Sequence, residues 1–121
     1  MSMRYQAAIM KPGFNPLGTQ TSGYQNALYS WGYNLYGQLG LNNTYYYSSP
    51  KQVGALTTWS YVTCTFASMT AVKTDGTLWS WGRNFYGQLG LNNTTNYSSP
   101  KQVGALTTWL KVACGYAHTI A

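Results

Sequence analysis

Acidic residues are almost absent from this chain, in which Asp75 is the single acid and there is no glutamate. A catalytic pair of carboxylates therefore cannot come from one chain. One histidine, His118, and two cysteines, Cys64 and Cys114, form no group with the spacing of metal ligands. Together these absences predict a protein that is not an enzyme and that has no metal site and no cofactor.

Long apolar runs are also missing. No stretch of about 18 apolar residues could span a membrane, and the opening "MSMRYQAAIMKPG" is too interrupted for a secretory signal. The seven lysines and arginines give a net charge of +6, but they are scattered and form no basic run. Nucleic-acid binders usually gather such residues on one face. We therefore expect neither a membrane nor a specific nucleic acid as partner.

What the chain has instead is aromatic and small polar residues. Aromatic residues make up 17% of the 121 residues, with 12 tyrosines and 5 tryptophans, while charged residues make up only 7%. A hydrophobic share of 45% excludes disorder on grounds of composition. The length allows one domain with a modest core. Its surface must be solvated by amide and hydroxyl groups rather than by charge.

An internal repeat dominates the sequence, because Trp31 aligns with Trp81 at a spacing of 50 residues. Between residues 28–59 and 78–109, 27 of 32 positions are identical. The five differences are Tyr29/Trp79, Tyr33/Arg83, Leu35/Phe85, Tyr45/Thr95 and Tyr46/Asn96. Repeats of 20–50 residues are typical of solenoids, propellers or arrays.

Strand signals dominate within each repeat. The stretch "WSYVTCTF" is β-branched and aromatic, and the Asp75-Gly76 pair predicts a hairpin turn. No segment keeps a period of 3.6, so we expect almost no helix. Three spaced glycines should let Trp81, Tyr86 and Leu89 pack together. About four short strands per repeat favour a blade of an all-β propeller, built of four-stranded antiparallel sheets, over a solenoid.

Each repeat carries a motif of spaced glycines and polar residues, which in the second copy consists of Trp81, Gly82, Asn84, Gly87, Gln88, Leu89, Gly90, Pro100, Val103, Val112, Ala113, Gly115, His118 and Thr119. This motif resembles that of the regulator-of-chromosome-condensation repeat. The first copy departs from the pattern at Thr65 and Ser68, where glycine and histidine would stand. The resemblance implies a β-propeller, usually of seven blades. It implies no function, since no residue maps to the nucleotide-exchange site of the founding members.

The Asn-, Tyr- and Thr-rich sequence of the repeats is also similar to that of repeats in virion proteins of marine bacteriophages. That likeness implies a structural or assembly protein of a capsid or tail, located in the virion, whose partners are copies of itself or other virion proteins. A cytoplasmic location is the alternative. We expect an extended arm over residues 1–27, one propeller repeat over 28–77 and a second over 78–121 that lacks its final hairpin strand.

The two ends of the repeat region look complementary. Residues 26–32 have the pattern of a returning hairpin strand whose partner is missing, and the second copy stops before its own hairpin is complete. Two blades cannot close a ring, since propellers have about four to eight. Three or four chains could close one by exchanging strands. The alternative is that the chain is a fragment or an open array.

Candidate binding residues lie where the two copies differ. Four of the five differences fall in or beside loops, and the first-copy loop "NNTYYYSS" adds a third tyrosine. Tyrosine offers a large amphipathic contact area, which suits protein or glycan surfaces. The candidates for recognition of a host glycan or protein are Tyr33, Tyr45, Tyr46, Tyr47, Arg83 and Phe85. The alternative is that these side chains cover a neighbouring blade.

Two further expectations concern single side chains. His118 belongs to a turn of the repeat motif, and we expect a buried ring that is hydrogen-bonded to backbone rather than a catalytic base. Cys64 and Cys114 occupy equivalent positions, which point the same way in neighbouring repeats, so we expect small buried thiols and no disulfide.

Overall fold

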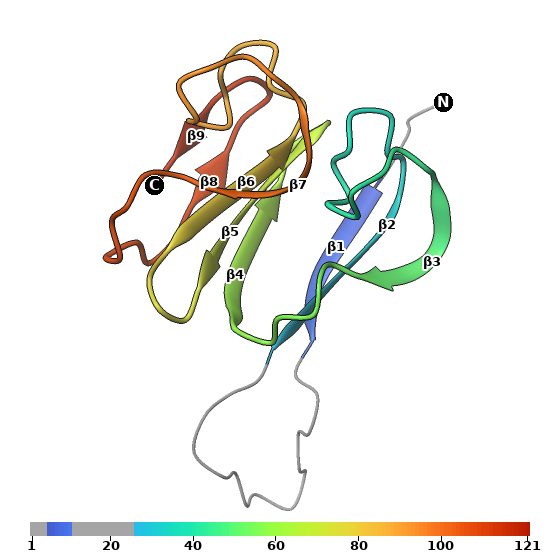
Figure 1. Cartoon of the computed structure of the whole chain (residues 1–121), viewed down its shortest axis with the longest axis horizontal. Coiled ribbons are helices and arrows are strands. Elements are labelled where there is room, and N and C mark those ends of the chain that lie inside the picture. Colours follow the sequence, from blue (N-terminus) through green and yellow to red (C-terminus); the bar gives the residue numbers. More distant parts are fainter. Residues whose placement is uncertain (1–4, 11–25) are drawn as a thin grey trace, which may run out of the picture.

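A computed structural model of the chain describes residues 5–10 and 26–121. These residues form strands joined by loops, and no helix that could cross a membrane is found among them. The all-β prediction is confirmed (Figure 1). The strands are β1 (Tyr5–Met10), β2 (Ala27–Gly32), β3 (Tyr47–Gln52), β4 (Trp59–Cys64), β5 (Ser68–Lys73), β6 (Leu78–Gly82), β7 (Tyr97–Gln102), β8 (Ala113–Cys114) and β9 (Thr119–Ile120).

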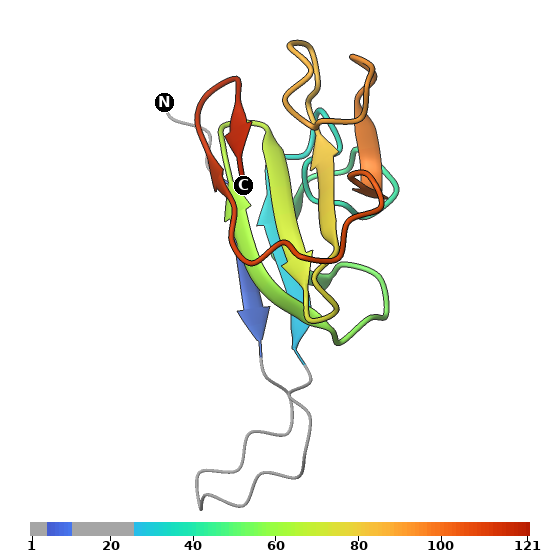
Figure 2. The same cartoon turned by 90° about the vertical axis from the view of Figure 1, so that its left-hand side faces the viewer.

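The strands make three antiparallel sheets that stand side by side (Figures 1 and 2). The first sheet has the order β1-β2-β3, the second β4-β5-β6-β7, and the third is the β8-β9 hairpin. One sheet thus reaches the expected four strands within the described residues. Within each sheet consecutive strands are neighbours, as in an up-and-down meander.

The sheets are offset from the sequence repeats. Residues 28–77 contribute β2 and β3 to the first sheet and β4 and β5 to the second. The 50-residue spacing therefore superposes β2 on β6 and β3 on β7, in successive sheets. Each copy of the repeat links two sheets, so identical side chains meet different neighbours.

The expectation that the strand at residues 26–32 lacks its hairpin partner is wrong. β1 pairs antiparallel with β2, with Tyr5 opposite Gly32 and Ala7 opposite Ser30. In the second sheet β5 pairs with β6 in the same register, with Thr70 opposite Ser80. An unpaired β2 edge would leave N–H and C=O groups free, and the segment just upstream satisfies them. The rest of the expected arm, residues 1–4 and 11–25, lies outside the described residues.

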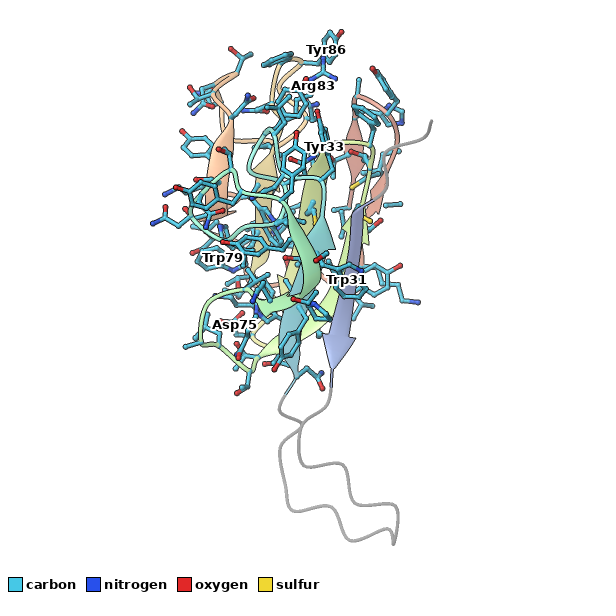
Figure 3. The ribbon with its side chains drawn as sticks, turned by 90° about the vertical axis from the view of Figure 1, so that its right-hand side faces the viewer. Trp31, Tyr33, Asp75, Trp79, Arg83 and Tyr86 are labelled. Atoms are coloured by element: carbon cyan, nitrogen blue, oxygen red, sulfur yellow. The ribbon has the colours of Figure 1, made fainter. Side chains whose placement is uncertain are left out.

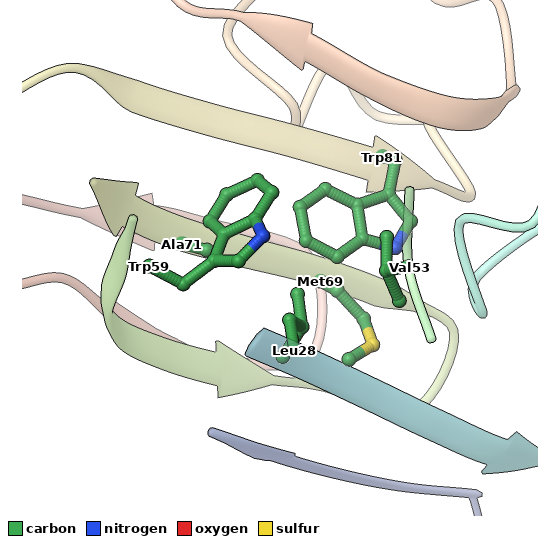
Figure 4. Close-up of a cluster of buried hydrophobic side chains, with 6 residues drawn as sticks. All are labelled: Leu28, Val53, Trp59, Met69, Ala71 and Trp81. Atoms are coloured by element: carbon green, nitrogen blue, oxygen red, sulfur yellow. The ribbon is translucent and has the colours of Figure 1, made fainter. Parts of the chain in front are cut away.

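The core lies between the first and second sheets (Figure 4). Leu28 of β2 and Val53, just after β3, meet side chains of the second sheet, and the Trp59 and Trp81 rings lie 5.9 Å apart. The six buried members are Leu28, Val53, Trp59, Met69, Ala71 and Trp81. A smaller core of Val72, Leu78 and Val112 joins the second sheet to the segment that leads into β8.

The Asp75-Gly76 hairpin forms as predicted. Lys73 N donates to Thr77 O at 2.9 Å, and Gly76 N donates to Lys73 O at 3.0 Å. Gly76 has a φ of +81°, which an L side chain rarely adopts. The Asp75 carboxylate accepts from the Thr77 backbone N–H at 3.0 Å and from its hydroxyl at 2.6 Å. The turn is therefore fixed by side-chain as well as backbone bonds.

Three expectations about burial are wrong. Cys64 is exposed and Cys114 is half-buried, although both are free as predicted. β4 lies at the edge of the second sheet, where Ser60, Tyr61 and Cys64 are exposed. His118 is exposed, with its imidazole against Gly115, where a bulkier residue would clash with the ring. Tyr86 is 63% exposed and does not pack with Trp81.

Candidate functional site

A long loop follows β2 and an equivalent one follows β6, and each is organised around a buried asparagine. The Asn34 amide nitrogen donates to the carbonyls of Asn43 and Tyr45 at 3.0 and 2.9 Å, and its oxygen accepts from Leu39 N at 2.9 Å. Asn84 makes the equivalent bonds in the second loop. One side chain thereby joins both arms of each loop and explains the asparagine of the repeat motif.

A glutamine side chain in each loop holds the backbone at the tip of that loop through a hydrogen bond. The Gln38 side-chain oxygen accepts from Tyr36 N at 2.9 Å, and that of Gln88 accepts from Tyr86 N at the same distance. Both glutamines are buried, whereas Tyr86 projects outward and is 63% exposed. The repeat motif thus presents a tyrosine at the tip of each loop on a fixed backbone.

Aromatic side chains from the two loops form one continuous cluster at the same end of the sheets (Figure 3). The Tyr33 ring stacks edge-on against Tyr46 at 5.0 Å and lies 6.5 Å from Tyr36. Tyr36 in turn meets Phe85 of the other loop edge-on at 5.7 Å. We call the set the rim cluster: Tyr33, Tyr36, Tyr46, Arg83, Phe85 and Tyr86.

Arg83 holds the second half of the rim cluster together. Its guanidinium carbon lies 4.5 Å from the ring centre of Phe85, 5.3 Å from that of Tyr36 and 5.8 Å from that of Tyr86. Its Nε is buried and has no hydrogen-bond partner among residues 5–10 and 26–121. A guanidinium on aromatic faces gains cation–π attraction. Its charge, however, finds no anion in this part of the chain.

The single acid cannot fill that role. Asp75 lies in the turn before β6 and Arg83 follows the end of that strand, so the strand separates them (Figure 3). Hydrogen bonds from Thr77 lower the pKa of Asp75 and hold it ionised at its own end. At the rim, desolvation and then the interaction with the Tyr46 hydroxyl raise the pKa of Tyr33. The rim cluster is thus neutral except for one cation.

Four of the six sequence-predicted residues come together in the rim cluster: Tyr33, Tyr46, Arg83 and Phe85. Tyr45 lies beside them and is 70% exposed, with no ring contact among the described residues. Tyr47 is separate, because its hydroxyl accepts from Asn43 at 3.2 Å and the Lys51 ammonium lies over its ring. Tyr47 thus has contacts typical of a structural residue.

Sequence comparison of the two copies missed Tyr36 and Tyr86. Both positions are tyrosine, so a search for differences between copies passes over them. An aromatic residue directly before the glycine of a tight loop is the signal that could have found them. Potential metal ligands do not gather anywhere in the part of the chain that the structure describes.

Comparison with known proteins agrees with the motif. The family model described as "Regulator of chromosome condensation (RCC1) repeat" matches residues 25–65 and 75–121, and a second model of that description matches 60–88. The chain belongs to the RCC1 repeat family. Among curated proteins no match was found. In this chain, the asparagine and the glutamine of the family motif are buried, and their hydrogen bonds hold the backbone of each loop.

Two solved structures share the propeller fold. Human WBSCR16 superposes with a TM-score of 0.56 at 26% identity over 67% of this chain. Yeast RCC1 (Prp20), in a structure with Kap60, superposes with a TM-score of 0.53 at 22% identity over 69% of this chain. The matched region spans 23% and 20% of those chains, respectively. These matches establish the RCC1-type β-propeller fold for this chain. They do not assign the activity of the whole relatives to it.

Proposed function

We propose that this chain is a protein-interaction module whose rim cluster binds a partner segment that carries an acidic side chain beside apolar ones. The observation that carries the proposal is Arg83, a cation held on three aromatic rings with no anion near it. A carboxylate of a partner would supply the missing charge, and arginine binds carboxylates in two-pronged fashion. The module binds its partner without transforming it.

The surrounding rings supply the contact area. Tyr46, Phe85 and Tyr86 are each at least half exposed, although their neighbours hold them in place. Rigid aromatic and arginine side chains carry most of the energy at protein interfaces. The net charge of +6 adds attraction for an acidic partner. The yeast RCC1 structure contains a bound protein, Kap60, which supports this kind of role for the fold.

Exchanging rim residues between the two copies tests the proposal. In Arg83→Tyr and Phe85→Leu, the second loop receives the residues that the first loop already holds at those positions. Peptides selected from a displayed random library should be rich in Asp and Glu beside apolar residues. Arg83→Tyr should weaken their binding at least about tenfold, because a charge-assisted bond is lost. Affinity should also fall with added salt.

Lys101→Gln is the matched control, because it removes one exposed positive charge away from the rim. It should leave peptide affinity within about twofold of the unmodified chain, since a distant surface charge is screened. Equal losses in both variants would show that net charge and not the rim determines binding. Selected peptides without acidic residues would contradict the proposed partner chemistry.

Glycan recognition is the competing outcome, and the first loop decides it. Tyr45 and Tyr46 are 70% and 54% exposed, and the second copy has Thr95 and Asn96 instead. Saturable binding to a glycan array that is lost in Tyr45→Thr and Tyr46→Asn would assign a lectin-like role. Such a result with no peptide binding would replace the proposed function.

We also propose an assembly role, as a component of a larger particle such as a bacteriophage virion. One observation favours it: large apolar side chains stand exposed around the third sheet, namely Leu106, Leu110, Tyr116 and Ile120, at 59 to 80% exposure. Exposed apolar groups in such number mark interaction surfaces. Light scattering over a dilution series should therefore show a stable oligomer, which Leu110→Ser with Ile120→Ser disrupts. A monomer at every concentration would contradict assembly between copies.

A further inference from the structure

A second candidate site lies between the first and second sheets, apart from the rim cluster. It is a cavity of about 530 Å³, within the range of small-molecule sites. The walls are formed by the rings of Trp59 (Figure 4) and Trp79 (Figure 3), by β7, and by β3 and loop residues of the first sheet. The lining residues that matter for binding are Asn42, Gln52, Trp59, Lys73, Trp79 and Ser99.

Lys73 is the unusual member of this cavity. The residue is only 8% exposed as a whole, but its ammonium nitrogen is not sealed from solvent, and it makes no hydrogen bond or ion pair within residues 5–10 and 26–121. Its Nζ lies 3.7 Å from the ring centre of Trp79 and 5.0 Å from that of Trp59. The charge of such a mostly buried side chain is partly desolvated, and the two aromatic faces compensate part of that cost.

The position of Trp79 is fixed by a chain of hydrogen bonds. Its indole Nε1 donates to the Thr77 hydroxyl at 2.8 Å, and that hydroxyl donates to Asp75 at 2.6 Å. The Asp75 carboxylate is thus occupied at the turn and does not pair with Lys73. Burial lowers the pKa of Lys73, and the more distant Asp75 only partly opposes this. The ammonium therefore lies in a preformed pocket that lacks a negative charge.

We propose that this pocket binds a small ligand with a single carboxylate, of the acidic-sugar type, with the Lys73 ammonium as its counter-ion. One unpaired cation balances one negative charge, which favours a carboxylate over a phosphate dianion. The side chains of Asn42, Gln52 and Ser99 offer amide and hydroxyl partners for sugar hydroxyls. The half-buried Trp79 ring adds an apolar wall that suits the apolar face of a sugar ring. The pocket is independent of the rim cluster and of its proposed partner.

Titration with glucuronate tests the assignment. Quenching of tryptophan fluorescence or calorimetry should show saturable binding, because Trp59 and Trp79 line the pocket. Glucose, which lacks the carboxylate, should bind at least about tenfold more weakly, as should the Lys73→Met variant with its neutral side chain. Trp79→Tyr, the residue of the first copy at this position, should weaken binding less.

Affinity should also depend on pH with a definite sign. Binding needs the charged ammonium, so affinity should fall as pH rises through the pKa of Lys73, which lies below its ordinary value. Lys73→Met should abolish this dependence while leaving rim binding of peptides unchanged, which shows that the fold persists. Equal binding by the unmodified chain and Lys73→Met would overturn the proposal. So would the absence of saturable binding at millimolar glucuronate, or a clear preference for inorganic phosphate.

Discussion

Replacing Trp81 by alanine is expected to lower the free energy of unfolding by about 4 kcal/mol, whereas the same change at Trp31 should cost about 1.5 kcal/mol. The two residues occupy the same position of the repeat. Trp81 is fully buried between the first two sheets, and its indole Nε1 donates to Gln38 O at 2.9 Å. Trp31 is partly exposed and has no such bond within the described residues. The difference between the two losses of unfolding free energy therefore measures the contact of Trp81 between the sheets and not a property shared by the repeat motif.

Urea denaturation followed by far-ultraviolet circular dichroism gives both values without relying on tryptophan fluorescence. Trp81→Phe serves as an intermediate variant, because it keeps an apolar ring but leaves the Gln38 carbonyl without its donor. Its cost should lie near 2 kcal/mol. The interpretation would fail if Trp31→Ala and Trp81→Ala destabilised the chain equally. Hydrogen exchange should show that amides of β2 lose protection in Trp81→Ala, although the substitution is in β6.

The strands and the hairpin turn could be predicted because their signals are local. Asp75-Gly76 needs only its own backbone geometry, and the β-branched stretch of β4 needs only its residue types. The sheet boundaries could not be predicted. A sequence repeat gives the length of the repeating unit, but it does not show at which residue of the unit one sheet ends and the next begins. The copy at 28–77 is shared between two sheets, and only the pairing of β4 to β7 reveals this. The pairing of β1 with β2 was missed because β1 lies outside the repeat, in the segment expected to be an extended arm.

The candidate sites differ in how far the sequence could locate them. Differences between copies indicated Arg83 and Phe85, since variable positions are freer to face outward. Tyr86 was missed because identity between copies hides an exposed residue as readily as a buried one. Lys73 was missed for a different reason. Its place between the Trp59 and Trp79 rings depends on the pairing of β4 and β6 to either side of β5, and no short motif encodes that.

Identical residues also differ in tolerance, for the same physical reason. A Cβ on Gly40 would lie 2.7 Å from the Trp81 indole nitrogen, because the next sheet packs against it. The equivalent Gly90 faces only Val103 at 3.3 Å. Both have a positive φ near +71°, so the backbone requirement is shared and the packing is not. The repeat motif therefore reflects only the shared need for a positive φ and not the difference in packing.

Replacing Asn34 by alanine is expected to lower the free energy of unfolding by about 3 kcal/mol, close to the loss at Trp81. The side chain is fully buried and bonds three backbone groups on both arms of its loop. Alanine leaves those groups without partners and opens the loop that carries Tyr33, Tyr36 and Tyr46. Urea denaturation should show the loss of stability, and peptide binding at the rim should weaken with it.

Asn34→Asp separates the hydrogen bonds from side-chain volume. The new carboxylate can still accept from Leu39 N but faces the carbonyls of Asn43 and Tyr45, which repel it. Its pKa in the folded chain must therefore rise above the ordinary value of about 3.9. The folded state then binds more protons than the unfolded state, so the deficit is full at neutral pH and shrinks as pH falls through the raised pKa. Asp75 is the only acidic side chain of the native sequence, and its lowered pKa keeps it ionised over most of the range between about pH 7 and 4. A deficit independent of pH between about 7 and 4 would show that the two carbonyl bonds do not hold the loop.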